Sequence, residues 1–214
     1  MSISPLAVRD AMNAGLADAL RTICVGLALF YALISSWYVF DIATASVELR
    51  TRVHFDLAIF SISLAEPTLR PLSTGIVSLG LLAAAVWFSR NKLPPGLAHP
   101  VAALIGVVVI INCLVLIVIG ADPRQTTNLM VAQIGFGCLL YSLGWYGFLT
   151  GLSLGGWLWV AGARRAEQEW YHFGVALIEA TLFGLLVLWV RRRAQRKVVE
   201  LHLHDQEQKA QLRA

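Results

Sequence analysis

The chain has 214 residues, of which 57% are hydrophobic and 14% are charged. Because soluble domains carry about a quarter charged residues, this composition excludes a disordered chain and argues against an ordinary water-soluble domain. The net charge of +4 does not indicate nucleic-acid binding, since a basic cluster directly follows the last apolar run, where such residues anchor a membrane helix on its cytoplasmic side. These membrane-anchor residues are Arg191, Arg192, Arg193, Arg196 and Lys197.

The apolar runs predict an all-α membrane protein with a bundle of about six transmembrane helices of roughly 20 residues each. In chain order the predicted spans are 20–41, 73–89, 100–120, 127–143, 145–163 and 170–190. The first run is too long for the core of a cleaved signal peptide, which favours an uncleaved span. Residues 127–163 carry no charge. They are long enough for two spans with a hinge at 142–146, where glycine coincides with aromatic residues suited to an interface.

Six spans place both termini on one side of the membrane, and the basic cluster assigns that side to the cytoplasm. Residues 1–19 are then a cytoplasmic N-terminal segment, and residues 46–72 are an extracytoplasmic loop. An apolar patch in this loop, at 57–64, is too short to span and suits a helix lying on the membrane surface. Counting the patch as a seventh span, which would place the N-terminus outside, is the main topological alternative.

Residues 191–214 contain no glycine or proline and are rich in helix formers. The last span is therefore predicted to continue into the cytoplasm as one linker helix from Trp170 to the end of the chain. A weak heptad register favours a homodimer through Val198, Leu201, Asp205, Gln208 and Leu212. The alternative is a solvated basic tail without a partner.

Polar side chains inside the spans are costly in hydrocarbon, so they are candidates for ligand sensing. Glu179 lies near the middle of the last span, and His172 precedes it by seven residues on the same helix face. We expect this pair to face the bundle interior as a proton-sensitive or ligand-binding pair. The alternative is a hydrogen-bonded Glu179 with His172 at the water interface. Asn112 and Gln133 line a cavity or, more often for such amides, bond neighbouring helices.

Small and aromatic residues predict how the helices pack. A helix-packing face that permits close contact, with this chain or a second copy, is formed by Gly144, Gly147, Gly151 and Gly155. All seven tryptophans lie near span ends, which predicts interfacial belts, with stacking on a pigment or quinone as the alternative for Trp157 and Trp159. The three cysteines are predicted to be small buried hydrophobes: Cys24, Cys113 and Cys138.

The sequence has none of the common catalytic or metal-binding motifs, such as His-Glu-x-x-His, Cys-x-x-Cys, a Walker loop or Gly-x-Ser-x-Gly. His202 and His204 are two residues apart, so on a helix they point to different faces. We therefore expect no enzyme, no catalytic residue and no metal site. The sequence identifies no cofactor.

Three stretches resemble the multi-pass membrane input region of bacterial sensor proteins: Ala98-His99-Pro100, the turn Asp122 to Met130, and Trp170 to Gly174. In that family the region precedes a cytoplasmic histidine kinase, PAS or GGDEF (diguanylate cyclase) module. The resemblance implies a non-catalytic signal-input module in a bacterial inner membrane. It would relay a stimulus through its C-terminal helix to an output domain or protein, as in two-component systems. The chain departs from the pattern, since it carries no kinase or GGDEF motif.

The turn of that pattern supplies a candidate sensing pocket on the outer side of the membrane. Its members are Asp122, Arg124, Thr127, Asn128 and His172, and the alternative is a helix cap with interface residues. Two other functions are open: a small proton-coupled transporter that uses Glu179, and a membrane scaffold subunit. The expected partners are the lipid bilayer, a second copy of the chain and the cytoplasmic output domain, with no nucleic acid.

Overall fold

The computed structural model describes residues 5–44, 52–57, 60–163 and 168–213. Six α-helices form in these residues: α1 (Pro5–Thr44), α2 (Glu66–Arg90), α3 (Ala98–Gly120), α4 (Thr126–Leu139), α5 (Leu143–Ala163) and α6 (Gln168–Arg213). Two single 3₁₀ turns precede α3 and α4, namely η1 (Pro95–Leu97) and η2 (Pro123–Gln125). A short hairpin of β1 (Arg52–Leu57) and β2 (Phe60–Ala65) precedes α2. The predicted all-α class is confirmed apart from this hairpin.

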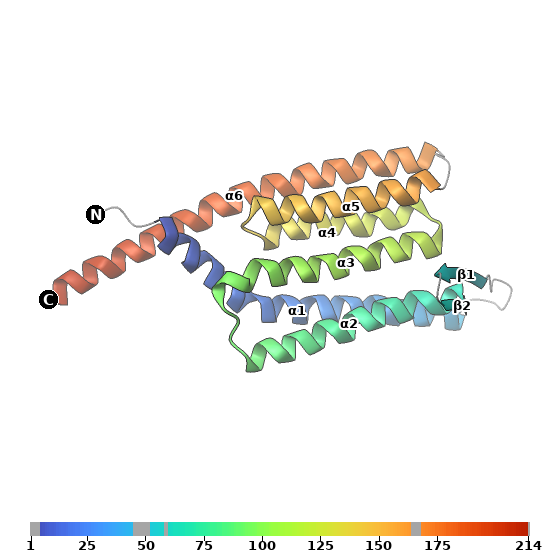
Figure 1. The fold of residues 1–214 in the computed structure, drawn as a ribbon, viewed down its shortest axis with the longest axis horizontal. Helices are drawn as coiled ribbons and strands as arrows, with labels where there is room; N and C mark the ends of the chain where they lie inside the picture. The colour runs from blue at the N-terminus through green and yellow to red at the C-terminus, as the bar shows by residue number, and fades with distance from the viewer. Residues whose placement is uncertain (1–4, 45–51, 58–59, 164–167, 214) are drawn as a thin grey trace.

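Helix α3 lies at the centre of the bundle, between the pair α1 and α2 and the group α4, α5 and α6 (Figure 1). Its most apolar stretch is 61% buried, whereas the corresponding stretches of α1, α2 and α6 are 17–22% buried. A helix that is apolar on every side can pack against neighbours all around. The most apolar run of the sequence has therefore become the central helix.

Helix α1 packs against α2 through hydroxyl groups that donate to backbone carbonyls. Ser78 Oγ donates to the Ala28 carbonyl at 2.8 Å, and Ser35 Oγ donates to the Pro71 carbonyl at 3.0 Å. The Ser35 bond therefore reaches α2 at Pro71, which lies inside this helix. Because α1 already begins at Pro5, the described part of the predicted segment 1–19 belongs to this helix. It is continuous with the first predicted span, and its cytoplasmic location stays a prediction.

Helices α4 and α6 approach each other at backbone contact. A Cβ added at Gly137 would collide with the carbonyl oxygen of Gly184, so this contact needs glycine on both helices. Beside it, Tyr146 Oη of α5 donates to the Thr181 carbonyl of α6 at 2.7 Å. The contact between α4 and α6 thus depends on small residues on both helices.

The predicted helix-packing face of α5 points outward instead. Gly144, Gly147, Gly151 and Gly155 are all exposed. A Cβ built at the last three would meet no atom within 4 Å, and one at Gly144 would meet only the Ser142 hydroxyl of the same chain segment, at 3.8 Å. Close contact between this face and another described helix of the chain, one of the two predicted options, is therefore wrong.

The loop predicted at 46–72 differs from the expectation. Its described part forms the antiparallel hairpin, with Arg52 paired to Ala65 and Leu57 paired to Phe60, and α2 begins already at Glu66. Both the surface helix over 57–64 and the alternative seventh span are therefore wrong. The remaining residues, 45–51 and 58–59, lie outside the described part.

Four helices are long and apolar enough to cross a membrane: α1, α2, α3 with η1, and α6. These helices establish a membrane protein by length and composition. Helix α4 has 14 residues, so it is about 21 Å long, shorter than the roughly 30 Å hydrocarbon core. Its end at Leu139 and the start of α5 at Leu143 put the break slightly before the predicted hinge at 142–146.

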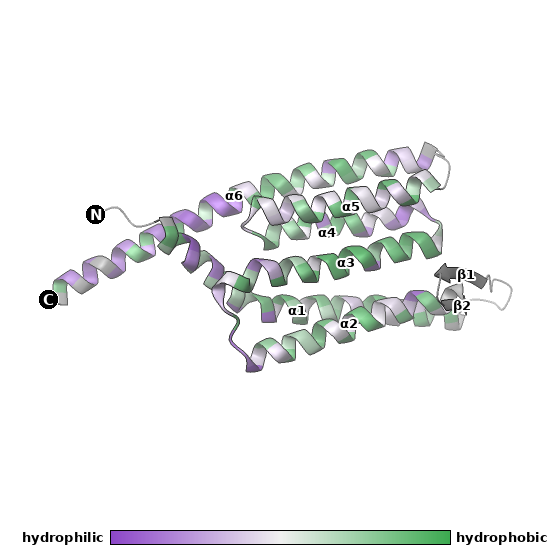
Figure 2. Ribbon diagram, in the orientation of Figure 1, coloured by the Kyte–Doolittle hydropathy of each residue, from purple (hydrophilic) through white to green (hydrophobic). Residues whose placement is uncertain are grey.

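Long polar helix segments extend past one end of the bundle. Figure 2 shows hydrophilic residues in the first turns of α1 and in α6 beyond the bundle, and these two segments lie at the same end of the molecule (Figure 1). Helix α6 is continuous over 46 residues, as the absence of glycine and proline after Val190 predicts.

A candidate ligand cavity and the exit of helix α6

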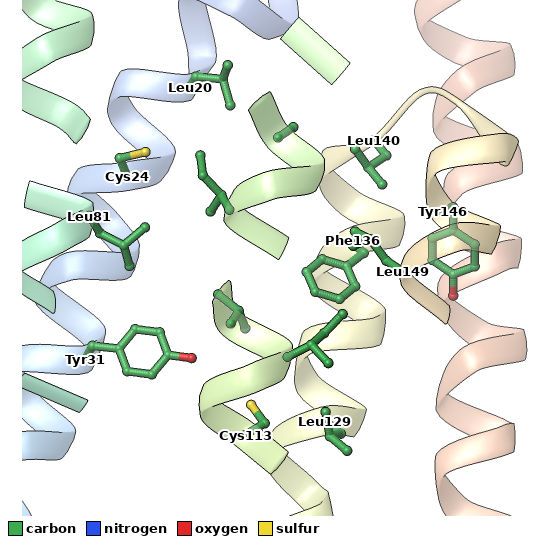
Figure 3. Close-up of a cluster of buried hydrophobic side chains, with 14 of the residues drawn as sticks. Leu20, Cys24, Tyr31, Leu81, Cys113, Leu129, Phe136, Leu140, Tyr146 and Leu149 are labelled. Atoms are coloured by element: carbon green, nitrogen blue, oxygen red, sulfur yellow. The ribbon is translucent and has the colours of Figure 1, made fainter. Parts of the chain in front are cut away.

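A cavity of about 910 Å³ lies between α1, α3 and α4. Its lining runs along α1 from Leu16 to Tyr38, a distance of about 33 Å at 1.5 Å per residue. Most lining residues are apolar, and Figure 3 shows two of them, with Tyr31 of α1 pointing toward α3 and Phe136 on α4. The volume is at the upper end of the roughly 300–1,000 Å³ typical of small-molecule sites.

One end of the cavity is formed by Arg191 of α6 and Tyr141, which follows α4. Arg191 Nη2 donates to Tyr141 Oη at 3.1 Å, and the guanidinium carbon lies 5.2 Å from the centre of the Tyr141 ring. Arg191 Nη1 is buried and finds no hydrogen-bond acceptor among the described residues. Because a buried charged donor without an acceptor is costly, this end of the cavity favours an acceptor from a bound molecule.

Arg191 differs from the other predicted membrane-anchor residues. It is half-buried, whereas the other four are exposed: Arg192, Arg193, Arg196 and Lys197. The guanidinium of Arg193 lies over the Trp189 ring at 5.7 Å, and Arg196 pairs with Glu200 at 2.8 Å. One member of the basic cluster thus serves the cavity, while the others remain at the surface.

Two of the predicted sensing residues line the cavity, Asn112 and Asn128. Asn112 is buried, and its Oδ1 has no hydrogen-bond partner within the described part of the chain. Asn128 Nδ2 donates to Gln125 Oε1 at 3.0 Å, and both of these residues belong to the lining. The cavity therefore has amides on α3 and α4 in addition to its cationic end.

The other members of the predicted sensing pocket lie elsewhere. Asp122 caps η2 by accepting from the Arg124 backbone N–H at 2.9 Å, and Thr127 Oγ1 donates to the Arg124 carbonyl at 2.7 Å. His172 is exposed on α6. None of the three lines the cavity, so the five residues do not form one pocket. The alternative of a cap describes Asp122, which caps η2, whereas no side chain caps α4.

The expectation that Glu179 faces the bundle interior is wrong, because its side chain is exposed. The buried seam of α6 instead follows steps of three, four and seven residues through Trp170, Gly174, Leu177, Gly184 and Leu188, with the half-buried Thr181 between the third and fourth. Glu179 is two residues from Leu177 and therefore points to the opposite side of the helix. The glycines of this seam let α6 approach the neighbouring helices closely, and the Glu179 carboxyl group lies on the opposite, exposed side of α6.

Gln133 lies fully buried between α4 and α5 and outside the cavity. Its Oε1 accepts from Thr150 Oγ1 at 3.1 Å, while its Nε2 has no partner in the described residues. This is a bond between neighbouring helices of the kind expected for buried amides.

The belt prediction is wrong for two tryptophans. Trp157 and Trp170 are buried, with ring centres 6.3 Å apart. Trp157 Nε1 donates to Thr126 Oγ1 at 2.9 Å, and a Cβ at Gly174 would lie 2.5 Å from the Trp157 ring. Of the cysteines predicted to be buried, Cys138 is exposed and lines the cavity.

The sequence interpretation missed the role of Arg191 because it treated the basic cluster as a unit. The signal was present, since Arg191 follows Leu188 by three residues and therefore continues the buried seam of α6.

No protein-family model, curated protein or solved structure matches this chain. The function is therefore argued from the cavity and from the helix that leaves it.

Proposed function

We propose that the chain is a non-catalytic membrane input module that binds a ligand in the cavity between α1, α3 and α4 and signals its presence through α6. One observation carries this proposal. Arg191 lies on the helix that leaves the bundle, lines the cavity, and bonds to Tyr141. A ligand that changes the Arg191–Tyr141 contact would bias the position of α6 relative to α4, and a signal requires such a differential contact.

Helix α6 has the form of a transmission element. Beyond Arg191 it continues without a break to Arg213, which is about 33 Å at 1.5 Å per residue. Exposed pairs one turn apart support this part, Arg196–Glu200 at 2.8 Å and Asp205–Lys209 at 2.6 Å. A continuous helix passes rotation or tilt to whatever is attached at its end.

The same proposal includes the topology and the assembly. Helices α4 and α5 run in opposite directions (Figure 1). Counting them as membrane helices changes the total from four to six and keeps both chain termini on the same side of the membrane. The exposed arginines after Val190 assign that side to the cytoplasm of a bacterial inner membrane. A homodimer with parallel α6 helices and a cytoplasmic output domain or protein completes the scheme.

The transporter alternative receives less support from the geometry. Glu179, the acid on which it depends, lies on the outer side of α6 and does not line the cavity. If purified chain in liposomes carries a proton flux that Glu179→Gln abolishes, the transporter replaces the input module.

The test is a fusion of an output enzyme after Ala214, compared with two leucine substitutions of exposed helix glycines. Gly135 lines the cavity, and a Cβ at this position meets no atom within 4 Å. Gly135→Leu therefore fills cavity space without disturbing the helices. Gly80 of α2 is equally open but lies outside the cavity, so Gly80→Leu is the matched control.

We expect Gly135→Leu to change the output activity severalfold, and Gly80→Leu to leave it at the unsubstituted level. We insert one to four residues between 198 and 205. The output activity should rise and fall with the number of inserted residues, because each residue rotates the following helix by about 100°. Equal activity in Gly135→Leu and Gly80→Leu, together with no effect of any insertion, would refute the proposal.

A further inference from the structure

The cavity combines an apolar lining with a single cationic end, which restricts the chemistry of its occupant. We propose that it holds an acyl chain of an anionic phospholipid, with the lipid phosphate bound to Arg191 and Tyr141. This inference rests on the proposed function and names the ligand class of the same cavity. The argument has three parts: the hydrogen bonds open at Arg191, the charge around it, and the length and shape of the apolar lining.

The unpaired N–H groups of Arg191 match a phosphate. Arg191 Nη2 is used by Tyr141, whereas the buried Nη1 has no acceptor among the described residues. A phosphate presents several acceptor oxygens, and a guanidinium binds it with charge-assisted, often bidentate, hydrogen bonds. Tyr141 Oη accepts from Arg191 and keeps its own proton. The hydroxyl can therefore donate to a second phosphate oxygen.

The charge around this end favours an anionic over a zwitterionic lipid. The four exposed basic residues of the cluster, Arg192, Arg193, Arg196 and Lys197, follow Arg191 on the same helix. Basic pockets between membrane helices on the cytoplasmic side bind anionic headgroups, and each basic residue near the surface contributes about 1 kcal/mol of attraction to anionic lipids. A choline headgroup brings a cation toward this cluster and is disfavoured.

The lining is long enough to hold a lipid tail. The apolar wall of α1 extends about 33 Å from the Arg191 end, while one leaflet of the hydrocarbon core is roughly 15 Å thick, half of the full core. A chain anchored at Arg191 therefore lies wholly within the cavity. The wall of α4 leaves room for it at Gly135, where an added Cβ would meet no atom within 4 Å. A quinone would also fit the apolar part, but it carries no charge for Arg191.

The test is lipid retention by the full chain purified in mild detergent and mixed with equal amounts of phosphatidylglycerol and phosphatidylcholine. Native mass spectrometry reports which lipid stays bound. We expect preferential retention of phosphatidylglycerol. Arg191→Gln should lower that retention about tenfold to a hundredfold, because hydrogen bonds to a charged group are lost.

Three further variants separate the site from general charge and from folding. Arg191→Lys keeps the positive charge but lacks the paired N–H donors of the guanidinium. This variant should retain an intermediate amount of phosphatidylglycerol. Arg192→Gln removes one exposed charge and should lower retention by no more than about fivefold, clearly less than Arg191→Gln. Gly135→Leu should reduce retention by filling the tail site, and Gly80→Leu should not. Circular dichroism and gel filtration confirm that each variant is folded, and if Arg191→Gln does not fold, Arg191→Lys and Gly135→Leu decide the question.

The inference is overturned if phosphatidylglycerol and phosphatidylcholine are retained equally, if Arg191→Gln and Arg192→Gln behave alike, or if the purified chain carries a quinone in place of a phospholipid. Its failure is distinguishable from failure of the proposed function. If the output activity still responds to Gly135→Leu but no anionic lipid is retained, the chain is an input module for another ligand. If the lipid is retained but the output activity does not respond, the cavity is a lipid site and the proposal of an input module is refuted.

Discussion

Replacing Gly137 with alanine tests the backbone contact between α4 and α6. The new Cβ would collide with the Gly184 carbonyl oxygen and would lie 2.8 Å from Gly184 Cα. Carbon atoms prefer a separation of about 3.5–4.0 Å, so the two helices must move apart by roughly 1 Å. Overpacking of this kind costs about 1–3 kcal/mol. The upper part of that range applies here because the obstacle is backbone, which cannot rotate away.

Gly135→Ala is the matched control on the same helix. It makes the same chemical change two residues away, where a Cβ meets no atom within 4 Å. Removing a helix glycine without a collision is neutral or stabilises by up to about 1 kcal/mol. The two variants should therefore differ in sign, although they have the same composition.

The free energy of unfolding can be measured by titrating the protein in mixed micelles with a denaturing detergent and following far-ultraviolet circular dichroism. We expect Gly137→Ala to be at least about 1 kcal/mol less stable than Gly135→Ala. If Gly137→Ala is as stable as the unsubstituted chain, α4 and α6 are not in backbone contact, and the seam assigned to α6 is wrong.

Three further substitutions test individual contacts by the same unfolding measurement. Trp157→Phe removes the donor to the fully buried Thr126 hydroxyl and should cost about 1–3 kcal/mol, whereas Trp159→Phe, at a side chain 75% exposed, should change stability by less than about 0.5 kcal/mol. Equal losses of stability in Trp157→Phe and Trp159→Phe would show that Trp157 is not part of the core. Asp122→Ala removes the acceptor of the turn before α4 and should cost about 0.5–2 kcal/mol, while asparagine at this position should retain most of the stability. Glu179→Leu should not lower stability, because the side chain is exposed on an apolar helix, and a clear loss would show that it is held by contacts.

The central position of α3 and the ends of the helices could be predicted because local chemistry decides them. The uninterrupted apolar run at 100–120 suits a helix with neighbours on every side, and α3 occupies that place. The gaps between the predicted spans at 89–100 and 120–127 contain Pro94-Pro95-Gly96 and Asp122-Pro123, and η1 and η2 form there. Proline without a backbone donor and a carboxylate that caps the next turn act over a few residues, so the sequence alone contains the information.

The region before α2 was misjudged because run length was weighed above periodicity. Residues Arg52 to Leu57 alternate polar and apolar side chains, and Phe60 to Leu64 alternate as well. This period of two is typical of strands, and the structure has a hairpin there. An apolar patch that is too short to span does not by itself indicate a helix.

The burial of Arg191 and the exposure of Glu179 differ from the expectation for one physical reason. An acid within an apolar run was expected to turn inward, and a basic residue after the run was expected to face lipid headgroups. The side of α6 that packs is instead selected by the residues that permit close approach, Gly174 and Gly184. Once these fix the seam, the step from Leu188 to Arg191 turns the arginine toward Tyr141 and the cavity, and Glu179 is left outside. Small residues therefore determine which polar groups of this helix can meet a ligand.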